Sequence, residues 1–164
     1  MIHHVSIPAR DPQATAAVLS KLTGWPARPF LGPCPGAFML LSDDAFGTTI
    51  EVYPDGTEIA PGEGADQGFM RPGAAPSLFA FHMLLSLEVT PEHVLQVAED
   101  AGWRALRCWR GPPGNPLFEL IEFWVENRFM IEVATPEMLD NYRRTVSQAG
   151  YDAAIAARRP PEPA

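Results

Sequence analysis

The chain of 164 residues is predicted to be an α+β protein made of two consecutive modules with the order β-α-β-β-β. The tripeptide Ile-Glu-Val occurs twice, at residues 50–52 and 131–133. Each copy closes a stretch that begins with a histidine in an apolar strand, His4 or His82, and the helix caps recur at a similar spacing. We therefore expect two copies of one unit, which form a curved mixed sheet or half-barrel around a central site.

The first module is assigned to residues 1–54. Residues 2–7 alternate between faces and are rich in β-branched residues, which is typical of a strand. Asp11 followed by proline is a helix start, and Gly24 is suited to end that helix. Three further strands complete the module, and they begin near residues 25, 37 and 48.

The second module, residues 77–134, repeats this order. Its helix starts at Thr90, again followed by proline, and ends at Gly102. The offset between the copies is 78 residues for the histidine and for the glycine, and 81 for the glutamate. Different residue types that keep nearly one offset indicate an internal duplication.

The remaining segments lie between and after the modules. Residues 55–76 are rich in glycine, proline and alanine, which is typical of a linker. A third threonine-proline pair predicts a C-terminal helix at residues 135–149, expected to cover a sheet face or support a subunit contact. Residues 150–164 are expected to be a disordered tail.

Alternation along the strands predicts which side chains share a face. In each Ile-Glu-Val copy the aliphatic residues take the helix-packing face, so Glu51 and Glu132 point to the opposite, concave face. The same rule places His4 and His82 on that face. Four further residues are expected there as lining of a substrate pocket: Ser6, Tyr53, Trp124 and Met130.

Two imidazoles and two carboxylates form a donor set suited to a divalent metal ion. Two carboxylates inside a curved sheet cost several kcal/mol each if nothing neutralises them. We therefore predict that His4, Glu51, His82 and Glu132 bind a divalent cation such as Fe, Ni, Zn or Mn. Six-coordination would leave two positions open for a substrate that chelates through two oxygens.

A hairpin turn at residues 126–128 places a further carboxylate near this site. If Val125 pairs with Phe129, Glu122 faces Glu132 across the two strands. Facing like charges destabilise a strand pair, so the pKa of Glu122 is expected to be raised, and Glu122 and Glu132 are the candidate catalytic residues for proton transfer. The alternative is that Glu122 forms an ion pair with an arginine, such as Arg28 or Arg110.

These features resemble the vicinal oxygen chelate superfamily, the group of glyoxalase I, bleomycin-resistance proteins and extradiol dioxygenases. The opening residues 2–11 look like its entry strand, in which the histidine before valine, here His4, binds metal. The two Ile-Glu-Val copies look like its ligand-bearing closing strands. The resemblance covers about residues 1–134 and implies a glyoxalase-like fold, but the superfamily hosts many reactions.

The function expected from the residues and the resemblance is a metal-dependent enzyme for a small oxygenated substrate, of isomerase, epimerase or lyase type. One alternative is an iron(II)-dependent dioxygenase. Another is a metal-free binding protein of the drug-sequestering kind. The resemblance also implies a homodimer, with sites built within one chain or between two.

Composition limits the partners. A net charge of −8 and a pI near 4.9 argue against nucleic acid, which would require a basic stripe. There is no apolar stretch of membrane-spanning length and no visible signal peptide, so a cytoplasmic protein with reduced thiols at Cys34 and Cys108 is expected.

Overall fold

The computed structural model describes residues 3–32, 34–60, 63, 69–78, 82–111 and 116–156. The first module forms one four-stranded sheet and one helix, with the strand order β1-β4-β3-β2. Its elements are β1 (His4–Ala9), α1 (Pro12–Thr23), β2 (Ala27–Pro29), β3 (Phe38–Leu41) and β4 (Thr49–Pro54). Within this sheet β1 and β4 run parallel, whereas the other pairs are antiparallel.

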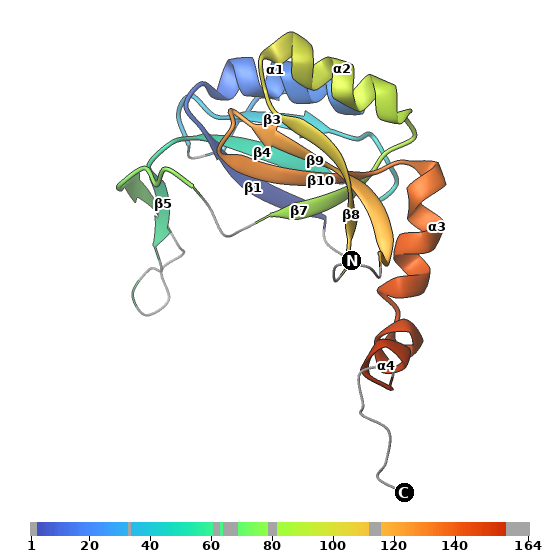
Figure 1. Cartoon of the computed structure of the whole chain (residues 1–164). Helices are drawn as coiled ribbons and strands as arrows, with labels where there is room; N and C mark the ends of the chain where they lie inside the picture. The colour runs from blue at the N-terminus through green and yellow to red at the C-terminus, as the bar shows by residue number, and fades with distance from the viewer. Residues whose placement is uncertain are drawn as a thin grey trace, which may run out of the picture.

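The second module repeats this topology. Its elements are β7 (Met83–Ser86), α2 (Pro91–Ala101), β8 (Ala105–Arg110), β9 (Phe118–Val125) and β10 (Phe129–Ala134). The strand order is β7-β10-β9-β8, and β7 runs parallel to β10. The expected duplication of a β-α-β-β-β unit and the α+β class are therefore confirmed (Figure 1).

The helix boundaries follow the predicted signals. The Asp11 side chain accepts a hydrogen bond from the backbone of Ala14 at the start of α1, and Thr90 caps α2 in the same way. Gly24 and Gly102 end the two helices in the left-handed region, with φ of 76° and 68°, where glycine has no Cβ penalty.

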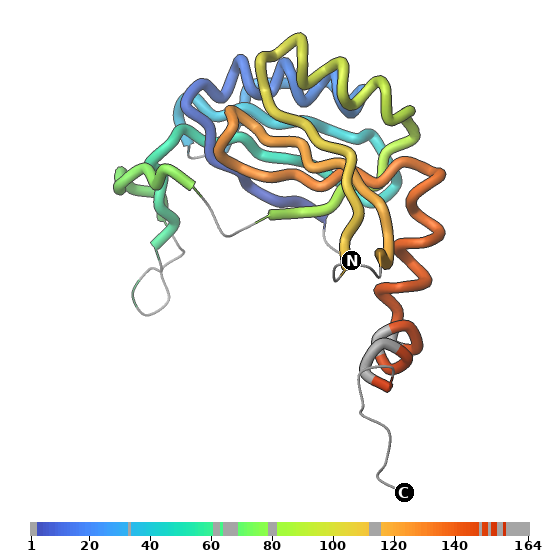
Figure 2. The backbone as a smooth tube through the Cα atoms, viewed as in Figure 1, coloured from blue at the N-terminus to red at the C-terminus, as the bar shows by residue number. Residues whose placement is uncertain are grey.

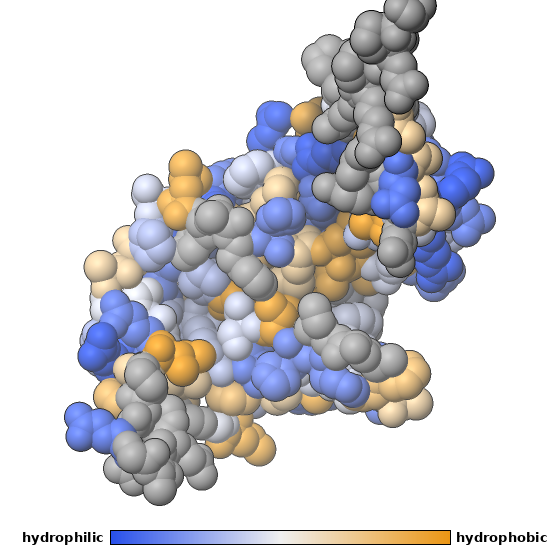
Figure 3. Space-filling model, turned by 90° about the horizontal axis from the view of Figure 1, so that it is seen from below, coloured by the Kyte–Doolittle hydropathy of each residue, from blue (hydrophilic) through white to orange (hydrophobic). Residues whose placement is uncertain are grey.

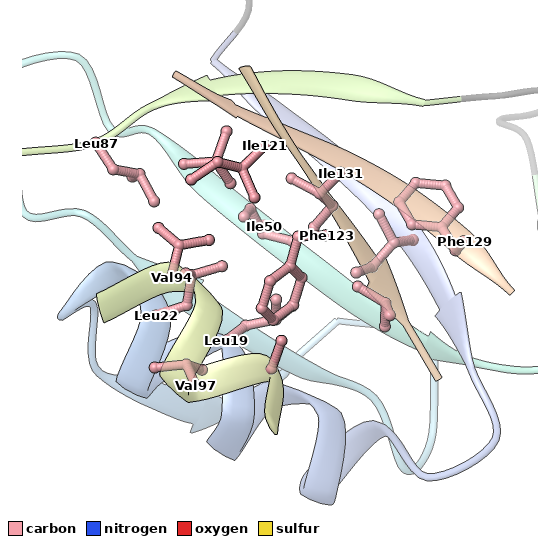
Figure 4. Packing of buried hydrophobic residues seen from close by; sticks show 14 of the residues in the cluster. Leu19, Leu22, Ile50, Leu87, Val94, Val97, Ile121, Phe123, Phe129 and Ile131 are labelled. Carbon is pink, nitrogen blue, oxygen red and sulfur yellow. The ribbon is translucent and has the colours of Figure 1, made fainter. Parts of the chain in front are cut away.

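One hydrophobic core joins the modules. Helices α1 and α2 lie side by side over one face of both sheets (Figure 1). Side chains from both helices pack against both sheets (Figure 4). The aliphatic residues of the Ile-Glu-Val copies are buried in this core, as the alternation predicted: Ile50, Val52, Ile131 and Val133.

The sheet face opposite α1 and α2 is called the concave face below. Helix α3 (Pro136–Thr145) packs on β9 and β10 at one end of the second sheet. Met138 of α3 is buried, and the ring of Tyr142 meets that of Phe118 edge to face at 5.2 Å. The expected C-terminal helix thus covers part of a sheet.

Two segments contain more structure than the sequence indicated. Strands β5 (Thr57–Ala60) and β6 (Phe69–Pro72) form an antiparallel hairpin within the predicted linker. Helix α4 (Gln148–Ala156) occupies the start of the predicted tail, and residues 157–164 lie outside the described residues. The chain passes through this hairpin between the modules (Figure 2). None of the described helices is long and apolar enough to cross a membrane.

The turn between β9 and β10 connects the second module to the first. The Glu126 carboxylate accepts hydrogen bonds from the backbone N–H groups of Arg10 and Asp11, at 2.9 and 3.2 Å, and from the Thr15 hydroxyl at 3.2 Å. A carboxylate is favourable beside a helix N-terminus, where N–H groups are unpaired. Glu126 therefore fixes the start of α1 against the second module.

Arg128, in the same turn, makes a second connection. Its nearly buried guanidinium forms an ion pair with Asp55, which directly follows β4. It also donates to the backbone carbonyls of Pro76 and Ser77, at the end of the predicted linker. The turn thus contacts the first module and the connecting segment together.

Candidate functional site

In the first module, neutral hydroxyls hold the glutamate of the concave face. Glu51 on β4 is in register with Ser6 on β1. Its Oε2 accepts hydrogen bonds from the Ser6 hydroxyl at 3.0 Å and from the Tyr53 hydroxyl at 2.5 Å. No positive charge takes part in these two contacts.

Tyr53 is itself buried, and its proton is held in place. Burial, together with the hydrogen bond to Glu51, raises the pKa of Tyr53 to about 12. Both effects disfavour the phenolate. Tyr53 therefore remains a hydrogen-bond donor to Glu51 at neutral pH.

In the second module, the predicted register of the hairpin is confirmed. Val125 pairs with Phe129, and Glu122 lies opposite Glu132. Glu126 and Asn127 adopt positive φ, 51° and 57°, which allows the tight three-residue turn at residues 126–128. The carboxylates of Glu122 and Glu132 therefore lie next to each other on the concave face of the second module.

An arginine bridges these two carboxylates. Arg110, the last residue of β8, places Nη1 2.8 Å from Glu122 Oε1 and Nη2 2.6 Å from Glu132 Oε1. Trp124 Nε1 donates to the other oxygen of Glu122 at 3.0 Å. Of the two arginines considered from the sequence, Arg110 is the partner, whereas Arg28 donates to the carbonyl of Ala27.

This bridge corrects the expectation for Glu122. Burial alone would raise the pKa of Glu122, but the hydrogen bonds from Trp124 and Arg110 and the positive charge of Arg110 outweigh burial and lower it. The expected raised pKa is wrong because the hydrogen bonds from Trp124 and Arg110 and the charge of Arg110, and not the facing carboxylate, dominate. Glu122 is consequently ionised at neutral pH.

The two predicted histidine ligands line one cavity. His4 and His82 are exposed, and both lie on a cavity of about 280 Å³ between the start of β1 and β7, together with His3 and Trp25. His3 Nδ1 is 2.6 Å from the carbonyl oxygen of Phe46. The structure therefore brings together one predicted ligand from each module.

The predicted pocket residues divide into two groups. Ser6 and Tyr53 line a second cavity of about 410 Å³, between the first module and the β5–β6 hairpin, which Phe129 also borders. Trp124 and Met130 belong instead to the polar cluster around Arg110, where Met130 Sδ is 3.9 Å from Nη2. Hydrophilic and hydrophobic side chains are mixed on the side of the molecule viewed from below in Figure 3.

The four predicted ligands suit a metal ion in donor type, but they do not form one group among the described residues. Among the described residues, no three His, Cys, Asp or Glu side chains are grouped so that they could hold one. The donor types nevertheless suit a divalent cation, and they are placed equivalently in the modules. Glu51 is in register with Ser6, and Glu132 with Leu84, two residues after the histidine in each case. The four donors therefore match a divalent cation in chemical type and in strand position. In this structure, however, Glu51 is bound by Ser6 and Tyr53, and Glu132 is bound by Arg110.

Two features of this face were not predicted from the sequence. The hydroxyl pair of Ser6 and Tyr53 binds Glu51, although both residues were expected only as pocket lining. Ser6 could have been found from the sequence by expecting the first and fourth strands to pair in parallel, which places Ser6 next to Glu51. The second feature is the hairpin that borders the larger cavity, for which the glycine- and proline-rich composition gave no strand signal.

Comparisons with known proteins identify the fold. No family model matches the sequence, and no curated protein matches it. An integron cassette protein from the mobile metagenome of V. cholerae is similar in structure, with 16% identity and a TM-score of 0.51, over 83% of this chain and 94% of the other. A lactoylglutathione lyase from Agrobacterium tumefaciens has 12% identity and a TM-score of 0.50, over 84% and 94% of the chains.

A third similar structure is the fosfomycin resistance protein FosX from Listeria monocytogenes, with 12% identity and a TM-score of 0.51, over 81% and 87% of the chains. The chain therefore has the glyoxalase-like fold that the sequence resemblance implied. At these identities the similarity concerns the fold and not the reaction.

Proposed function

We propose that the protein is a metal-dependent enzyme whose concave face binds a small oxygenated substrate through two oxygens. The reaction would be an isomerisation, epimerisation or lyase reaction. The residues proposed to hold the divalent cation are His4, Glu51, His82 and Glu132.

One observation carries this proposal: the donor set is duplicated in register. Each module has a glutamate on its fourth strand, and the residue paired with it lies two positions after a histidine on the first strand. The two imidazoles, moreover, line the same cavity. Two unrelated surface histidines would have no reason to share this geometry.

A bound divalent cation would polarise a substrate carbonyl and stabilise the charge that develops on its oxygen. The protein groups would then position and move the proton. Glu122 is ionised and can accept a proton, and Trp124 orients its carboxylate. Its lowered pKa makes it a weak base while Arg110 is bound to it. Glu132 is the second candidate for proton transfer, because it lies in register with Glu122.

A second candidate function is metal-free binding of a small molecule, of the drug-sequestering kind. The observation that favours it is the Arg110 bridge, which already places a positive charge between Glu122 and Glu132. In that case the two cavities on the strands would hold the ligand without a cation.

Metal-dependent stabilisation separates the two functions. The full chain, freed of metal with a chelator, is titrated with Ni²⁺, Zn²⁺, Mn²⁺ or Fe²⁺, and its melting temperature is followed. A cation that binds only the folded protein raises the melting temperature. We expect this rise for the wild type but not for Glu51→Gln or His82→Ala.

The matched controls lie away from the proposed ligands. Glu119 lies on β9, where it accepts hydrogen bonds from Arg107 on β8. His93 lies on α2, where its Nε2 is 3.0 Å from the carbonyl oxygen of Lys21. Glu119→Gln and His93→Ala should respond to metal as the wild type does. Equal shifts in all five proteins would refute the proposed centre.

Elemental analysis of protein purified without chelators separates the reaction types. Nickel, zinc or manganese supports isomerase or lyase chemistry, whereas iron supports a dioxygenase. We also propose a homodimer, for which light scattering should give a mass near twice the chain mass of 17.9 kDa.

A further inference from the structure

Arg110 binds the carboxylate of Glu132, which is one of the proposed metal ligands. Three of its contacts are directed to acidic oxygens: Nη1 to Glu122 at 2.8 Å, and Nη2 and Nε to Glu132 Oε1 at 2.6 and 3.2 Å. Two donors therefore converge on one oxygen of Glu132. These two donors use both lone pairs of Oε1, so a metal ion that binds this oxygen must displace at least one of them.

The surroundings strengthen this contact. The side chains of Arg110, Glu122 and Glu132 are 31%, 16% and 13% exposed. Partly buried ion pairs are less screened than those in open solvent, and charge-assisted hydrogen bonds are roughly twice as strong as neutral ones. Without Arg110, two facing carboxylates would share this part of the sheet, and their repulsion would favour a bound cation between them.

The position of Arg110 also allows it to move. It ends β8, the outer strand of its sheet, and Gly111 follows with a φ of 128°, so the regular strand stops there (Figure 1). Its long side chain reaches from this outer strand over β9 to β10. Release of Glu132 would therefore involve the end of an outer strand and not the strands inside the sheet.

We propose that Arg110 is a built-in competitor for the cation: its guanidinium holds Glu132 in the metal-free protein, and cation binding at the concave face requires Arg110 to leave that carboxylate. This inference rests on the proposed metal centre. It adds that the centre is controlled from within the chain, and that only the second module carries this control, because Glu51 is held by neutral hydroxyls.

The chain offers a matched control three residues away. Arg107 on the same strand also bridges two carboxylates, Glu119 at 2.7 Å and Glu137 at 2.9 Å. By strand alternation it points to the other face, and neither glutamate is a proposed ligand. Arg107→Met thus removes an arginine with the same local chemistry but without a contact to the proposed centre.

The experiment measures the affinity of the metal-free full chain for Ni²⁺ and Mn²⁺ alone, by isothermal titration calorimetry. Methionine keeps an unbranched side chain without the charge, and circular dichroism verifies folding. We expect Arg110→Met to bind the cation about tenfold or more tightly than the wild type, the factor that corresponds to the loss of one competing charged contact. Arg107→Met should match the wild type.

Arg110→Lys keeps the proposal testable if Arg110→Met does not fold. A lysine ammonium lacks the planar fork that reaches two carboxylates in fixed geometry, so it should compete less well and give an intermediate affinity. Equal affinities of the wild type and every folded Arg110 variant would overturn the proposal and leave the metal centre standing.

Two other outcomes concern the metal centre itself. If neither the wild type nor any Arg110 variant binds a cation, both proposals fail. If only the Arg110 variants bind, the competition is supported, but the wild type functions without metal. Tighter binding by Arg107→Met to the same extent as by Arg110→Met would show a general effect of net charge and would also overturn the competition.

Discussion

Glu51 and Glu132 occupy equivalent positions in the two modules, yet their partners differ in kind. Ser6 and Tyr53 donate neutral hydrogen bonds to Glu51, whereas Glu132 is bound by the guanidinium of Arg110. On the opposite face the modules are alike, because the neighbours of both glutamates are buried aliphatic residues. The duplicated unit has thus kept its core-facing side and diverged on its concave side, which is where function can change without loss of the fold.

The largest effects should come from the side that the modules share. Ile50 and Ile131 are 1% and 0% exposed, at equivalent positions in the same core. We expect Ile50→Ala and Ile131→Ala each to lower the free energy of unfolding by about 2–5 kcal/mol. Urea denaturation measures both. A loss of about 2–5 kcal/mol at one site together with a loss below about 1 kcal/mol at the other would show that the core-facing sides are not equivalent.

The next effect distinguishes the concave faces. Glu122→Gln removes a carboxylate held by Arg110 and Trp124, so we expect it to lower the free energy of unfolding by about 1–3 kcal/mol at neutral pH. Glu51→Gln should cost less than about 1 kcal/mol, because the amide oxygen still accepts from both hydroxyls. Equal losses of unfolding free energy in the two variants would contradict the difference between the charged environment of Glu122 and the neutral environment of Glu51.

The same variant has a defined dependence on pH. The pKa of Glu122 is lowered in the folded protein, so its stabilising contribution is present above the unfolded value of about 4.3 and is lost as the pH falls through the lower folded value. Unfolding curves of the wild type and Glu122→Gln should therefore converge in acid. A difference that grows as the pH falls would have the wrong sign.

A smaller effect compares two helix starts. The Thr90 hydroxyl accepts a hydrogen bond from the backbone of His93, whereas Thr135 makes no side-chain cap and its buried hydroxyl has no hydrogen-bond partner among the described residues. We expect Thr90→Val to destabilise by about 1 kcal/mol and Thr135→Val to be neutral or stabilising. Thermal melting of the two variants tests this, and a loss at Thr135 as large as at Thr90 would contradict it.

The smallest change is spectroscopic. Tyr53 should titrate with a pKa of about 12, and the absorbance of the phenolate reports it. Tyr53→Phe should remove that step, and Glu51→Gln should shift it to lower pH, because the hydrogen bond to Glu51 is part of its cause. Since the folded pKa lies above the unfolded value of about 10, the contribution of Tyr53 to stability is lost only as the pH rises through the folded value. An unchanged titration in Glu51→Gln would contradict the Glu51 contact.

The fold could be predicted because its signals are local and repeated. Asp11, Thr90, Gly24 and Gly102 mark the helices by chemistry that acts within a few residues. The register of Glu122 against Glu132 followed from a short turn, since a hairpin loop fixes the pairing of its strands. Alternation then assigned the faces of the closing strands.

The site was harder to predict because it depends on distant segments. Residues 111–117 separate β8 from β9, so no short turn fixed the pairing of these strands, and the sequence named Arg110 only as one of two arginines without its reach to Glu132. The pKa of Glu122 was therefore assigned the wrong direction. Whether four ligands meet depends on the packing of one module against the other, which no local pattern specifies.

The turn at Glu126 and Arg128 has a consequence for the history of the duplication. Glu126 supplies the acceptor for the N–H groups at the start of α1, and Arg128 pairs with Asp55, so the second module completes the first. At the offset of 81 residues, this turn corresponds to Ala45 and Gly47 in the first module. Neither has a charged side chain that could bind the second module in the same way. A half-length ancestor would have met these needs in a neighbouring copy. In the present chain the second module holds the start of the first helix in place, and the corresponding turn of the first module has no charged side chain with which to do the same for the second.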